Sequence, residues 1–283
     1  MRRTLRNNFP IAAVLIFLAL AACQTTVLAQ GAAASAPKTE IWWLGQAAMR
    51  ITTPGGKVIM VDPWITNNPK TPEAYKNLDA LGKIDIILVT HAHGDHLGDG
   101  VALAKKNNVP LWGPAGLDQQ LQTLGLLSPE LAPRMNKGGT ITPFPGVKIT
   151  QVHAEHSSEM LWTDPDTKKQ STLAAGEPVG FIIELENGFT IYHMGDTGLF
   201  GDMKLIGERY HPDLLMIPIG GHFVMNPQDA AFATAQFLHP KYAIPMHYGT
   251  IPQLKGTPKE YIDALGSAPV KVFPINPGDK LSF

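Results

Sequence analysis

The sequence predicts a single α/β domain in which two packed sheets carry helices on their outer faces. Strand-like segments come first in clusters and then alternate with helices, and they fall into two halves of similar length. No change in composition marks an internal linker, and no repeat recurs at a period of about 20–50 residues. With 44% hydrophobic and 17% charged residues, the 283-residue chain can bury a sizeable core.

The first residues have the pattern of a secretory signal. Arg2, Arg3 and Arg6 precede an apolar run, Ile11 to Ala22, that is too short to span a bilayer comfortably. The alternative interpretation, a buried N-terminal core helix, does not account for three arginines followed directly by Ala, Leu and Ile.

The signal ends in Leu20-Ala21-Ala22-Cys23, which resembles the bacterial lipobox, where the cysteine is lipidated and becomes the first mature residue. Cleavage after Ala29 is the alternative, and it would release a soluble periplasmic or secreted protein. We therefore expect a lipoprotein-type signal peptide over 1–22, a flexible tether over 23–38 and a folded domain over 39–283. The expected location is the periplasmic face of a bacterial membrane.

The first half of the folded domain reads as strands followed by helices. Residues 41–44, 47–52, 57–61 and 84–90 have the composition of strands, and residues 101–106 and 117–124 have the composition of helices. The turn-forming run Pro54-Gly55-Gly56 joins the second and third of these strands. The fourth strand, 84–90, is mostly β-branched and apolar, as expected of a strand covered on both faces.

In the second half, strands alternate with two well-marked helices. Asp202 can cap a helix that ends near Tyr210, and Asn226 with Pro227 opens a second helix over 228–238. Strands are predicted at 148–153, 179–184, 189–193, 214–218, 242–245, 270–273 and 280–283 from their composition.

Charge and cysteine content exclude several classes of function. The chain has 23 Lys and Arg against 24 Asp and Glu; loss of the leader leaves 20 against 24, a net charge of −4. This balance, with no basic stripe, argues against nucleic-acid binding. One cysteine excludes a disulfide framework and a cysteine-rich zinc finger. Nothing in the sequence points to an oligomeric state.

A dense group of metal-ligating side chains follows the strand 84–90. His91-Ala92-His93-Gly94-Asp95-His96 places four ligand groups within six residues, at a bend that Gly94 permits. Imidazole and carboxylate suit zinc and also Fe, Mn or Ni. Because these groups cannot easily all reach one tetrahedral ion, the spacing suggests two metals. Solvated loop histidines, the alternative, do not explain this density.

The string His-x-His-x-Asp-His after an apolar strand resembles the signature of the metallo-β-lactamase superfamily. Further matching strings are Trp43-Leu44-Gly45, Val61-Asp62-Pro63, His156-Ser157-Ser158, Gly195 to Lys204 and Pro245 to Tyr248. They are similar to a bacterial and archaeal subfamily of metal-dependent hydrolases related to ascorbate-6-phosphate lactonase and the phospholipase D that acts on N-acyl ethanolamine lipids. The resemblance covers about residues 40–278 in order and implies an αβ/βα four-layer sandwich in a single metallo-hydrolase domain.

The resemblance also implies the roles of the ligands. His91, His93 and His156 would hold the first metal, Asp95, His96 and His247 would hold the second, and Asp196 would bridge both. Asp196 lies after a predicted strand in a Gly-Asp-Thr-Gly turn, which suits a short carboxylate that points out of a sheet edge. We expect two divalent ions, zinc first, with Mn, Ni or Fe as alternatives.

Several other polar residues are assigned less directly. Asp62 is expected to accept a hydrogen bond that orients a ligand histidine, and its alternative is a plain turn residue before Pro63. His153 competes with His156 for the first metal. His193 reads as a packed or supporting histidine, and no function is assigned to the two helix-end histidines, His211 and His239.

The predicted catalytic residues are Asp95, Asp196 and His222. His222 lies in a loop between a strand and a capped helix, where an imidazole could act as a general acid or an oxyanion donor; a substrate-contact or structural role is the alternative. The subfamily often has His where Gln46 stands and Asp where Gly221 stands, so roles played there by those residues are absent or reassigned in this chain.

These observations favour an exported hydrolase that uses a metal-bridging hydroxide on a small ester, lactone, amide or phosphodiester. The alternatives are a phosphodiesterase acting on a phospholipid or small phosphate ester, and a non-catalytic metal-binding lipoprotein. A β-lactamase with a cysteine ligand is disfavoured because the mature chain offers no such cysteine, and a diiron protein because these carry Glu where His93 stands. The expected partner is a small-molecule or lipid substrate, with membrane contact only through the lipid anchor.

Overall fold

The computed structural model describes residues 38–283, which form two large sheets and one small one. The predicted signal peptide, Cys23 and nearly all of the predicted tether lie outside the described residues. Within the described part, no helix is both long and apolar enough to cross a membrane.

The first large sheet has six strands and takes one strand from the end of the chain. Their order across the sheet is β15 (Lys280–Ser282), β1 (Glu40–Gly45), β2 (Ala48–Thr52), β3 (Val58–Val61), β4 (Ile86–Leu88) and β5 (Leu111–Trp112). The pairs from β15 to β3 are antiparallel, and β3, β4 and β5 are parallel.

The second large sheet has seven strands. Their order is β14 (Lys271–Val272), β13 (Tyr242–Met246), β12 (Leu214–Pro218), β11 (Thr190–His193), β10 (Val179–Glu184), β7 (Val147–His153) and β6 (Thr140–Phe144). The four strands from β11 to β14 are parallel, whereas β10 pairs antiparallel with both β7 and β11.

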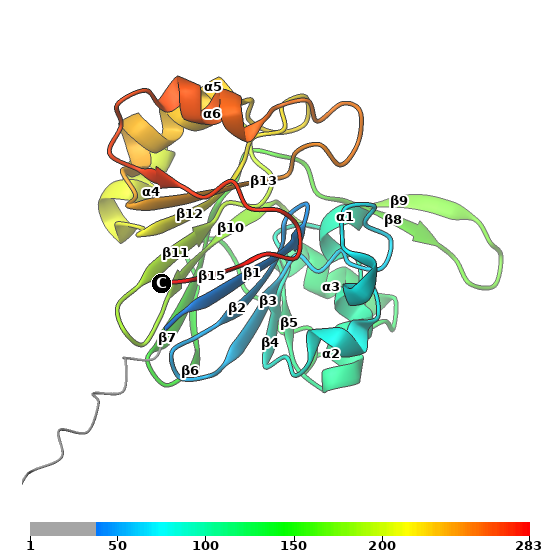
Figure 1. The fold of residues 1–283 in the computed structure, drawn as a ribbon. Coiled ribbons are helices and arrows are strands. Elements are labelled where there is room, and N and C mark those ends of the chain that lie inside the picture. The colour runs from blue at the N-terminus through cyan, green and yellow to red at the C-terminus, as the bar shows by residue number, and fades with distance from the viewer. Residues whose placement is uncertain (1–37) are drawn as a thin grey trace, which may run out of the picture. The chain divides into compact units, whose positions relative to one another are not determined.

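Helices cover the outer face of each sheet (Figure 1). The first sheet is flanked by α1 (Gly94–Leu97), α2 (Gly100–Asn107) and α3 (Ala115–Thr123). The second is flanked by α4 (Met203–Tyr210), α5 (Pro227–Phe232) with a π-helical continuation (Ala233–Leu238), and α6 (Pro258–Leu265). Two short 3-10 turns, Glu73–Tyr75 and Leu78–Leu81, complete the helical elements of residues 38–283.

The core consists of three layers of apolar side chains. One cluster lies between the sheets, where Met49 and Ile59 of the first sheet share a core with Phe181, Met216 and Ile244 of the second. The other two clusters join each sheet to its own helices. Helix, sheet, sheet and helix therefore form the predicted four-layer αβ/βα sandwich.

Several predicted elements agree with the structure to the residue, and others do not. The strands predicted over 179–184 and 214–218 are β10 and β12, and the helix predicted after Asp202 is α4. The strand predicted over 84–90 is shorter, since β4 ends at Leu88 and the ligand loop begins earlier. Helix α6 was not predicted, although its start has a capping box between Thr257 and Glu260.

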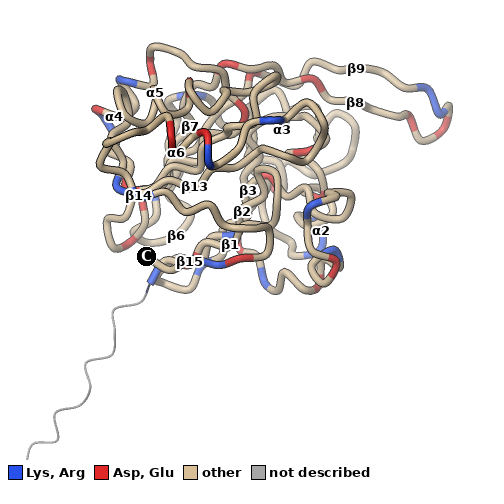
Figure 2. The backbone as a smooth tube through the Cα atoms, turned by 45° about the horizontal axis from the view of Figure 1, so that its top comes forward, with Lys and Arg blue, Asp and Glu red and all other residues tan. Residues whose placement is uncertain are grey.

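The segment 159–175, where no strand was predicted, is a two-stranded hairpin that extends away from the sandwich (Figures 1 and 2). It consists of β8 (Glu159–Thr163) and β9 (Gln170–Ala174). Met160 on β8 is buried, whereas Leu161 is 65% exposed.

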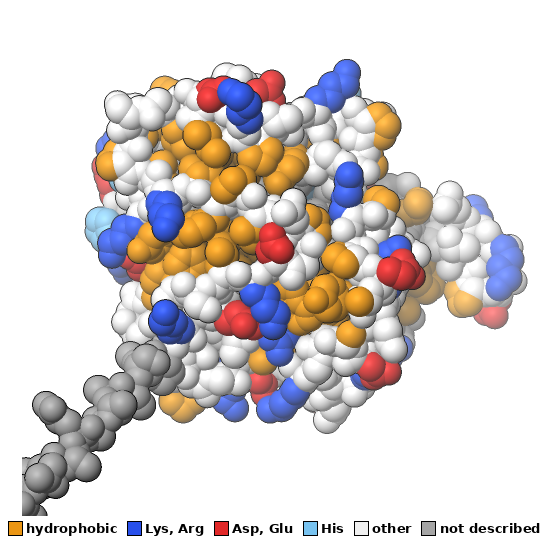
Figure 3. Space-filling model, viewed as in Figure 1, with side chains coloured by type: hydrophobic (Ala, Val, Ile, Leu, Met, Phe, Trp, Pro, Cys, Tyr) orange, Lys and Arg blue, Asp and Glu red, His pale blue; other side chains and the backbone are white. Residues whose placement is uncertain are grey.

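Charged side chains are distributed without a single dominant sign. On the face in Figure 3, Lys and Arg are interspersed with Asp and Glu around hydrophobic areas.

Parallel strands from both sheets end at one rim of the sandwich. The carboxyl ends of β3 and β4 precede Asp62 and His91, while those of β11 and β13 precede Asp196 and His247. Loops at the carboxyl ends of parallel strands are the usual place for binding sites in α/β folds. This rim therefore gathers the ligands that the sequence predicted.

Candidate metal centre

The central turn of the site, His91 to His96, leads from β4 into α1. His93 is the N-cap residue of α1 and has an extended backbone, so the chain turns sharply between His91 and the first helical residue, Gly94. His91 and His96 are fully buried, whereas His93 is partly exposed. The turn thus buries two of its four ligand groups, His91 and His96, and leaves His93 and Asp95 partly exposed at the rim.

The predicted ligands form three groups whose donor atoms lie within 4.8 Å of one another. The first group is His91, His93 and His156; the second is Asp95, His96 and His247; the third is His91, His96 and Asp196. The first two share no residue, and the third takes one histidine from each. All seven predicted ligand side chains are brought together.

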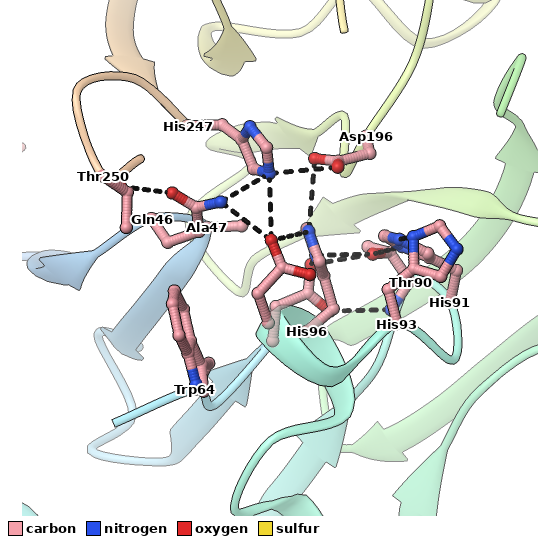
Figure 4. Close-up of polar contacts among 12 residues, drawn as sticks. Gln46, Ala47, Trp64, Thr90, His91, His93, His96, Asp196, His247 and Thr250 are labelled. Carbon is pink, nitrogen blue, oxygen red and sulfur yellow. Dashed lines mark hydrogen bonds and ion pairs between the residues drawn. The ribbon is translucent and has the colours of Figure 1, made fainter. Parts of the chain in front are cut away.

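Asp196 lies between the first two groups (Figure 4). Its Oδ1 is 3.3 Å from His96 Nε2, and its Oδ2 is 3.0 Å from His247 Nε2 and 3.7 Å from His156 Nε2. One carboxylate therefore reaches histidines of both groups.

Asp62 orients the ring of His96 through a hydrogen bond. The ring donates from Nδ1 to Asp62 Oδ2 over 2.8 Å, and both side chains are fully buried. Asp62 also accepts from the Thr90 backbone N–H and hydroxyl, each at 2.7 Å. With Nδ1 occupied, His96 presents Nε2 to the cluster, which is the supporting role predicted for Asp62.

Gln46 contacts two predicted ligands at once, a role that the sequence analysis did not assign. Its amide donates to Asp95 Oδ2 over 2.8 Å and lies 2.7 Å from His247 Nε2, while Thr250 donates to its carbonyl oxygen (Figure 4). The sequence signal was the departure from the subfamily's usual histidine at this position.

Left-handed backbone conformations concentrate at this site. Gln46, Asp62 and His247 have φ values of 51°, 46° and 56° without being glycine. Such conformations cost free energy in residues with a Cβ and persist where the surrounding structure enforces them. The backbone N–H of His247 donates to the Gln46 carbonyl, so two of these residues hold each other in place.

Burial and the two carboxylates set the protonation of the cluster. Burial alone would lower the pKa of His247, but Asp196 and Asp95 outweigh it and raise that pKa to about 9. Burial would also lower the pKa of His96, but Asp196, Asp62 and Asp95 raise that pKa well above its usual value. Burial would raise the pKa of Asp196, yet His247 and His96 hold it well below its usual range. The cluster is thus built to keep its carboxylates ionised beside a positive charge.

Unpartnered buried atoms show that the donor set fits a metal. His96 Nε2 and Asp196 Oδ1 are both buried without a hydrogen bond, although they face each other at ion-pair distance. Buried polar atoms normally have partners, so each such pair requires an explanation. A divalent cation bound between imidazole and carboxylate provides one, because both atoms are good ligands for it.

A pocket of about 440 Å³ opens over the cluster. Asp95, His156, Asp196 and His247 form its polar floor, and Trp64, Phe223, Ile251 and Leu254 contribute apolar walls; Gln46, His93 and Ser157 complete the lining. This volume is within the range of small-molecule sites.

His222 does not line this pocket. It is exposed, and it lies in a neighbouring hollow with Pro252, Gln253 and Lys255, while the next residue, Phe223, faces the cluster. The backbone of His222 has a φ of 60°, in the left-handed region, at the point where consecutive side chains enter different hollows. The position therefore gives no support to the catalytic role predicted for His222.

The remaining histidines lie outside the donor groups. His153 is partly exposed and lies beside Lys137 and Glu155, so His156 and not His153 is the histidine that joins the cluster. His193 is buried and donates to the Ala47 carbonyl at 2.9 Å. His211 and His239 end helices in the left-handed conformation.

Comparison with known proteins gives consistent matches. Residues 57–248 match the family described as a beta-lactamase superfamily domain. A UPF0173 metal-dependent hydrolase from Cupriavidus metallidurans is 61% identical over 249 residues, which cover 87% of this chain and 86% of the relative. A second UPF0173 metal-dependent hydrolase, from a Polaromonas species, is 59% identical over 246 residues, which cover 87% of this chain and 90% of the relative.

A solved structure extends the match to three dimensions. Igni18, a metallo hydrolase from the archaeon Ignicoccus hospitalis, superposes with a TM-score of 0.72 at 32% sequence identity. The match covers 87% of this chain and 98% of the archaeal protein.

Proposed function

This chain belongs to the metallo-β-lactamase superfamily and is a metal-dependent hydrolase, and we propose that it uses a dinuclear centre to hydrolyse a small ester, lactone, amide or phosphodiester. The single observation that carries the proposal is the place of Asp196. Its Oδ2 lies near both His156 and His247 and its Oδ1 lies near His96, so one carboxylate reaches histidines of both groups and could bridge two ions.

In this proposal, His91, His93 and His156 hold one ion, Asp95, His96 and His247 hold the other, and Asp196 binds both. Two divalent ions, when bound, lower the pKa of a water molecule from about 15.7 toward about 7 and polarise the scissile bond. Zinc is the first choice for this set of imidazole and carboxylate ligands, with Mn, Ni or Fe as alternatives.

The two pocket carboxylates would have different tasks. Asp95 lines the pocket and is one-third exposed, so a carboxylate oxygen can accept a hydrogen bond from the attacking water; against its burial, His96 and His247 hold its pKa below its usual range, so it too would be ionised. Asp196 is almost fully buried and stays ionised, so it orients groups rather than carrying protons. Gln46 and Asp62 keep Asp95, His247 and His96 in their directions.

An activity panel tests the proposal. The metal-loaded full-length protein and an Asp196→Ala variant are assayed on ester, lactone, amide, β-lactam and phosphodiester substrates. We expect hydrolysis of at least one class, reduced by about 10²-fold or more in the variant. Asp202→Ala is the matched control, because Asp202 is exposed and makes no capping hydrogen bond on α4.

Full activity of Asp196→Ala would remove this residue from the centre. A wild-type protein that binds two ions and hydrolyses no member of the panel would favour the alternative, a non-catalytic metal-binding lipoprotein. Hydrolysis of the phosphodiester alone would favour the phosphodiesterase.

We also propose that the protein is exported. The support is the pattern of residues 1–22 and the Leu-Ala-Ala-Cys string that ends at Cys23. A Cys23→Ser variant in a bacterial host is expected to lose incorporation of labelled fatty acid. Unchanged labelling would show that Cys23 is not the lipidated residue.

A further inference from the structure

Among residues 38–283, the lining of the pocket over the metal centre has one apolar side and includes no lysine or arginine. Trp64, Phe223, Ile251 and Leu254 form the apolar side, and the polar side is the ligand cluster with Gln46 and Ser157. Phe223 is 50% exposed and Ile251 is 41% exposed, although both are large hydrophobic residues. Exposed apolar side chains that converge on a polar site mark a place where an apolar ligand group can be buried.

We propose, on the basis of the proposed function, that the substrate is uncharged away from its scissile group and carries an apolar acyl chain that packs on these four residues. The scissile group would lie over Asp95 and Asp196, and the chain would extend toward Phe223 and Ile251. A substrate with a second anionic group, such as a phosphorylated lactone, would find no lysine or arginine in the lining to pair with it.

Three separate loops build the apolar side. Trp64 follows β3, Phe223 follows β12, and Ile251 and Leu254 follow β13. Figure 4 shows Trp64 on the same side of the site as Gln46. The loops after β3 and β13 also carry Asp62 and His247, and β12 lies between β11 and β13 in the second sheet, so the apolar side and the ligands are parts of one rim.

The loops that carry Phe223 and Ile251 are fixed against each other. The Gly256 N–H donates to the Gly220 carbonyl over 3.0 Å, and the Met225 N–H donates to the carbonyl of Thr197, the residue after Asp196. A Cβ at Gly256 would lie 1.9 Å from the Ile219 oxygen, and one at Gly220 would lie 2.2 Å from the His247 oxygen. The apolar side is therefore held at a set distance from the ligands.

The two lysines of these loops, Lys70 and Lys255, line other hollows. Lys255 lines the hollow that also contains His222, and it is not part of the lining over the cluster. The apolar side of the pocket and the hollow that contains Lys255 are thus separate surfaces, as a site that selects neutral chains requires.

Alkyl hydroxamates test this inference without relying on turnover, because the hydroxamate binds metal and the alkyl chain reports the apolar side. Calorimetry of the metal-loaded full-length protein would compare acetohydroxamate through octanohydroxamate. We expect affinity to rise about two- to fourfold per methylene, or about 60-fold or more across the series. Glutaric monohydroxamate, which ends in a carboxylate, is expected to bind more weakly than pentanohydroxamate.

Two double variants localise the effect. Phe223→Ala with Ile251→Ala is expected to reduce the gain per methylene to less than about 1.5-fold. The matched control is Phe232→Ala with Ile262→Ala, on α5 and α6, where the same residue types are 48% and 41% exposed. The control is expected to keep the wild-type slope.

Three results would each overturn the proposed apolar chain while leaving the metal centre intact. They are equal affinities across the alkyl series in the wild type, an unchanged gain per methylene in the Phe223 and Ile251 variant, and tighter binding of the carboxylate-ended probe. Absence of acetohydroxamate binding would instead overturn the metal centre, and this inference with it.

Discussion

Gln46 joins two ligands assigned to the same ion. Its amide contacts Asp95 and His247, and Thr250 holds the other end of that amide. Groups that orient metal ligands typically contribute 10- to 100-fold to metal affinity. In the proposed dinuclear centre, Asp95 and His247 would therefore depend on an uncharged amide for their direction.

Gln46→Met removes this amide and keeps the size of the side chain. We expect the affinity for one of the two ions to fall about 10- to 100-fold and the affinity for the other to stay unchanged. Metal titration followed by calorimetry measures both. Gln151→Met is the control, because Gln151 is also buried but donates to the Gly113 carbonyl, outside the cluster. Two unchanged affinities in Gln46→Met would contradict the role given to Gln46.

Asp118 on α3 is a buried carboxyl whose partner in the structure is the Gly113 backbone N–H. Burial raises its pKa to about 8, against the opposing effects of that hydrogen bond and of Arg134. In the unfolded chain the group ionises near pH 4, whereas in the folded chain it resists ionisation until about pH 8. The free energy of unfolding therefore falls as pH rises through this window.

Asp118→Asn keeps a carbonyl acceptor for Gly113 and cannot ionise. We expect the variant to gain stability relative to the wild type by at least about 1 kcal/mol between pH 4 and pH 9. Urea denaturation at the two pH values measures the difference. A constant gap would show that the carboxyl ionises in the folded state without cost.

Single residues were predictable where the ligands are adjacent in sequence. The turn from His91 to His96 has too many ligand groups for a surface loop, and the positions of Asp196 and His247 followed from resemblance. The Gln46 contact was not predictable, because it depends on two loops 201 residues apart meeting at the rim. The direction of His222 was also hidden, since a positive φ turns it away from the pocket.

At the scale of elements, the loops after β12 and β13 determine the shape of the pocket. Gly256 lies where these loops touch, and any side chain there would collide with the Ile219 carbonyl. The chain must therefore separate the loops or distort them to accept a larger residue.

Gly256→Ala is expected to lower the free energy of unfolding by about 1–3 kcal/mol, because the new Cβ has no space. Gly201→Ala is the matched control: nothing lies within 4 Å of a Cβ there, so its stability is expected to change by no more than about 1 kcal/mol. Urea denaturation compares the two. Equal stabilities would show that the two loops are not in rigid contact.

Elements with strong local signals were predicted well, and those fixed by tertiary pairing were not. Strands β10 and β12 are apolar and bounded by turn residues, and α5 begins where Asn226 accepts from the Asp229 N–H. The hairpin of β8 and β9 was missed because Met160, Leu161 and Trp162 are apolar in a row, which hides the alternation of buried and exposed residues that the structure shows. The two-residue strand β5 is too short to give a periodic pattern. The capping box of α6 was a readable signal that the sequence analysis did not use.

At the scale of the whole molecule, the metal centre connects the two halves of the sandwich. His91, Asp95 and His96 follow a strand of the first sheet, while Asp196 and His247 follow strands of the second. Ions that bind only the folded arrangement stabilise it, because ligand binding shifts the folding equilibrium toward the binding-competent state.

Chelation of the metal is therefore expected to lower the melting temperature. An ion present at 1,000 times its Kd adds about 4 kcal/mol, and 1 kcal/mol corresponds to about 2–4 °C in a domain of this size. We expect a loss of at least about 8 °C, which added zinc reverses. Asp196→Ala should show less than half of this shift, and Asp202→Ala should show all of it. A melting temperature that is insensitive to chelation would mean that no ion links the sheets.

The architecture of two sheets with outer helices was readable from the order of strand and helix patterns, but the placement of β15 was not. This last strand pairs with β1 in the first sheet, far from it in sequence, through register contacts such as Ile41 with Leu281. Pairing between the two ends of a domain leaves no local signal, since it depends on the closure of the whole fold.

The central claim is that one rim of the sandwich binds two metal ions through seven side chains. Elemental analysis of the purified full-length protein, alongside Asp196→Ala, tests it most directly. We expect about two equivalents of transition metal per chain in the wild type and a clear loss in the variant. Less than about half an equivalent in the wild type after loading with zinc, or an unchanged content in the variant, would contradict it.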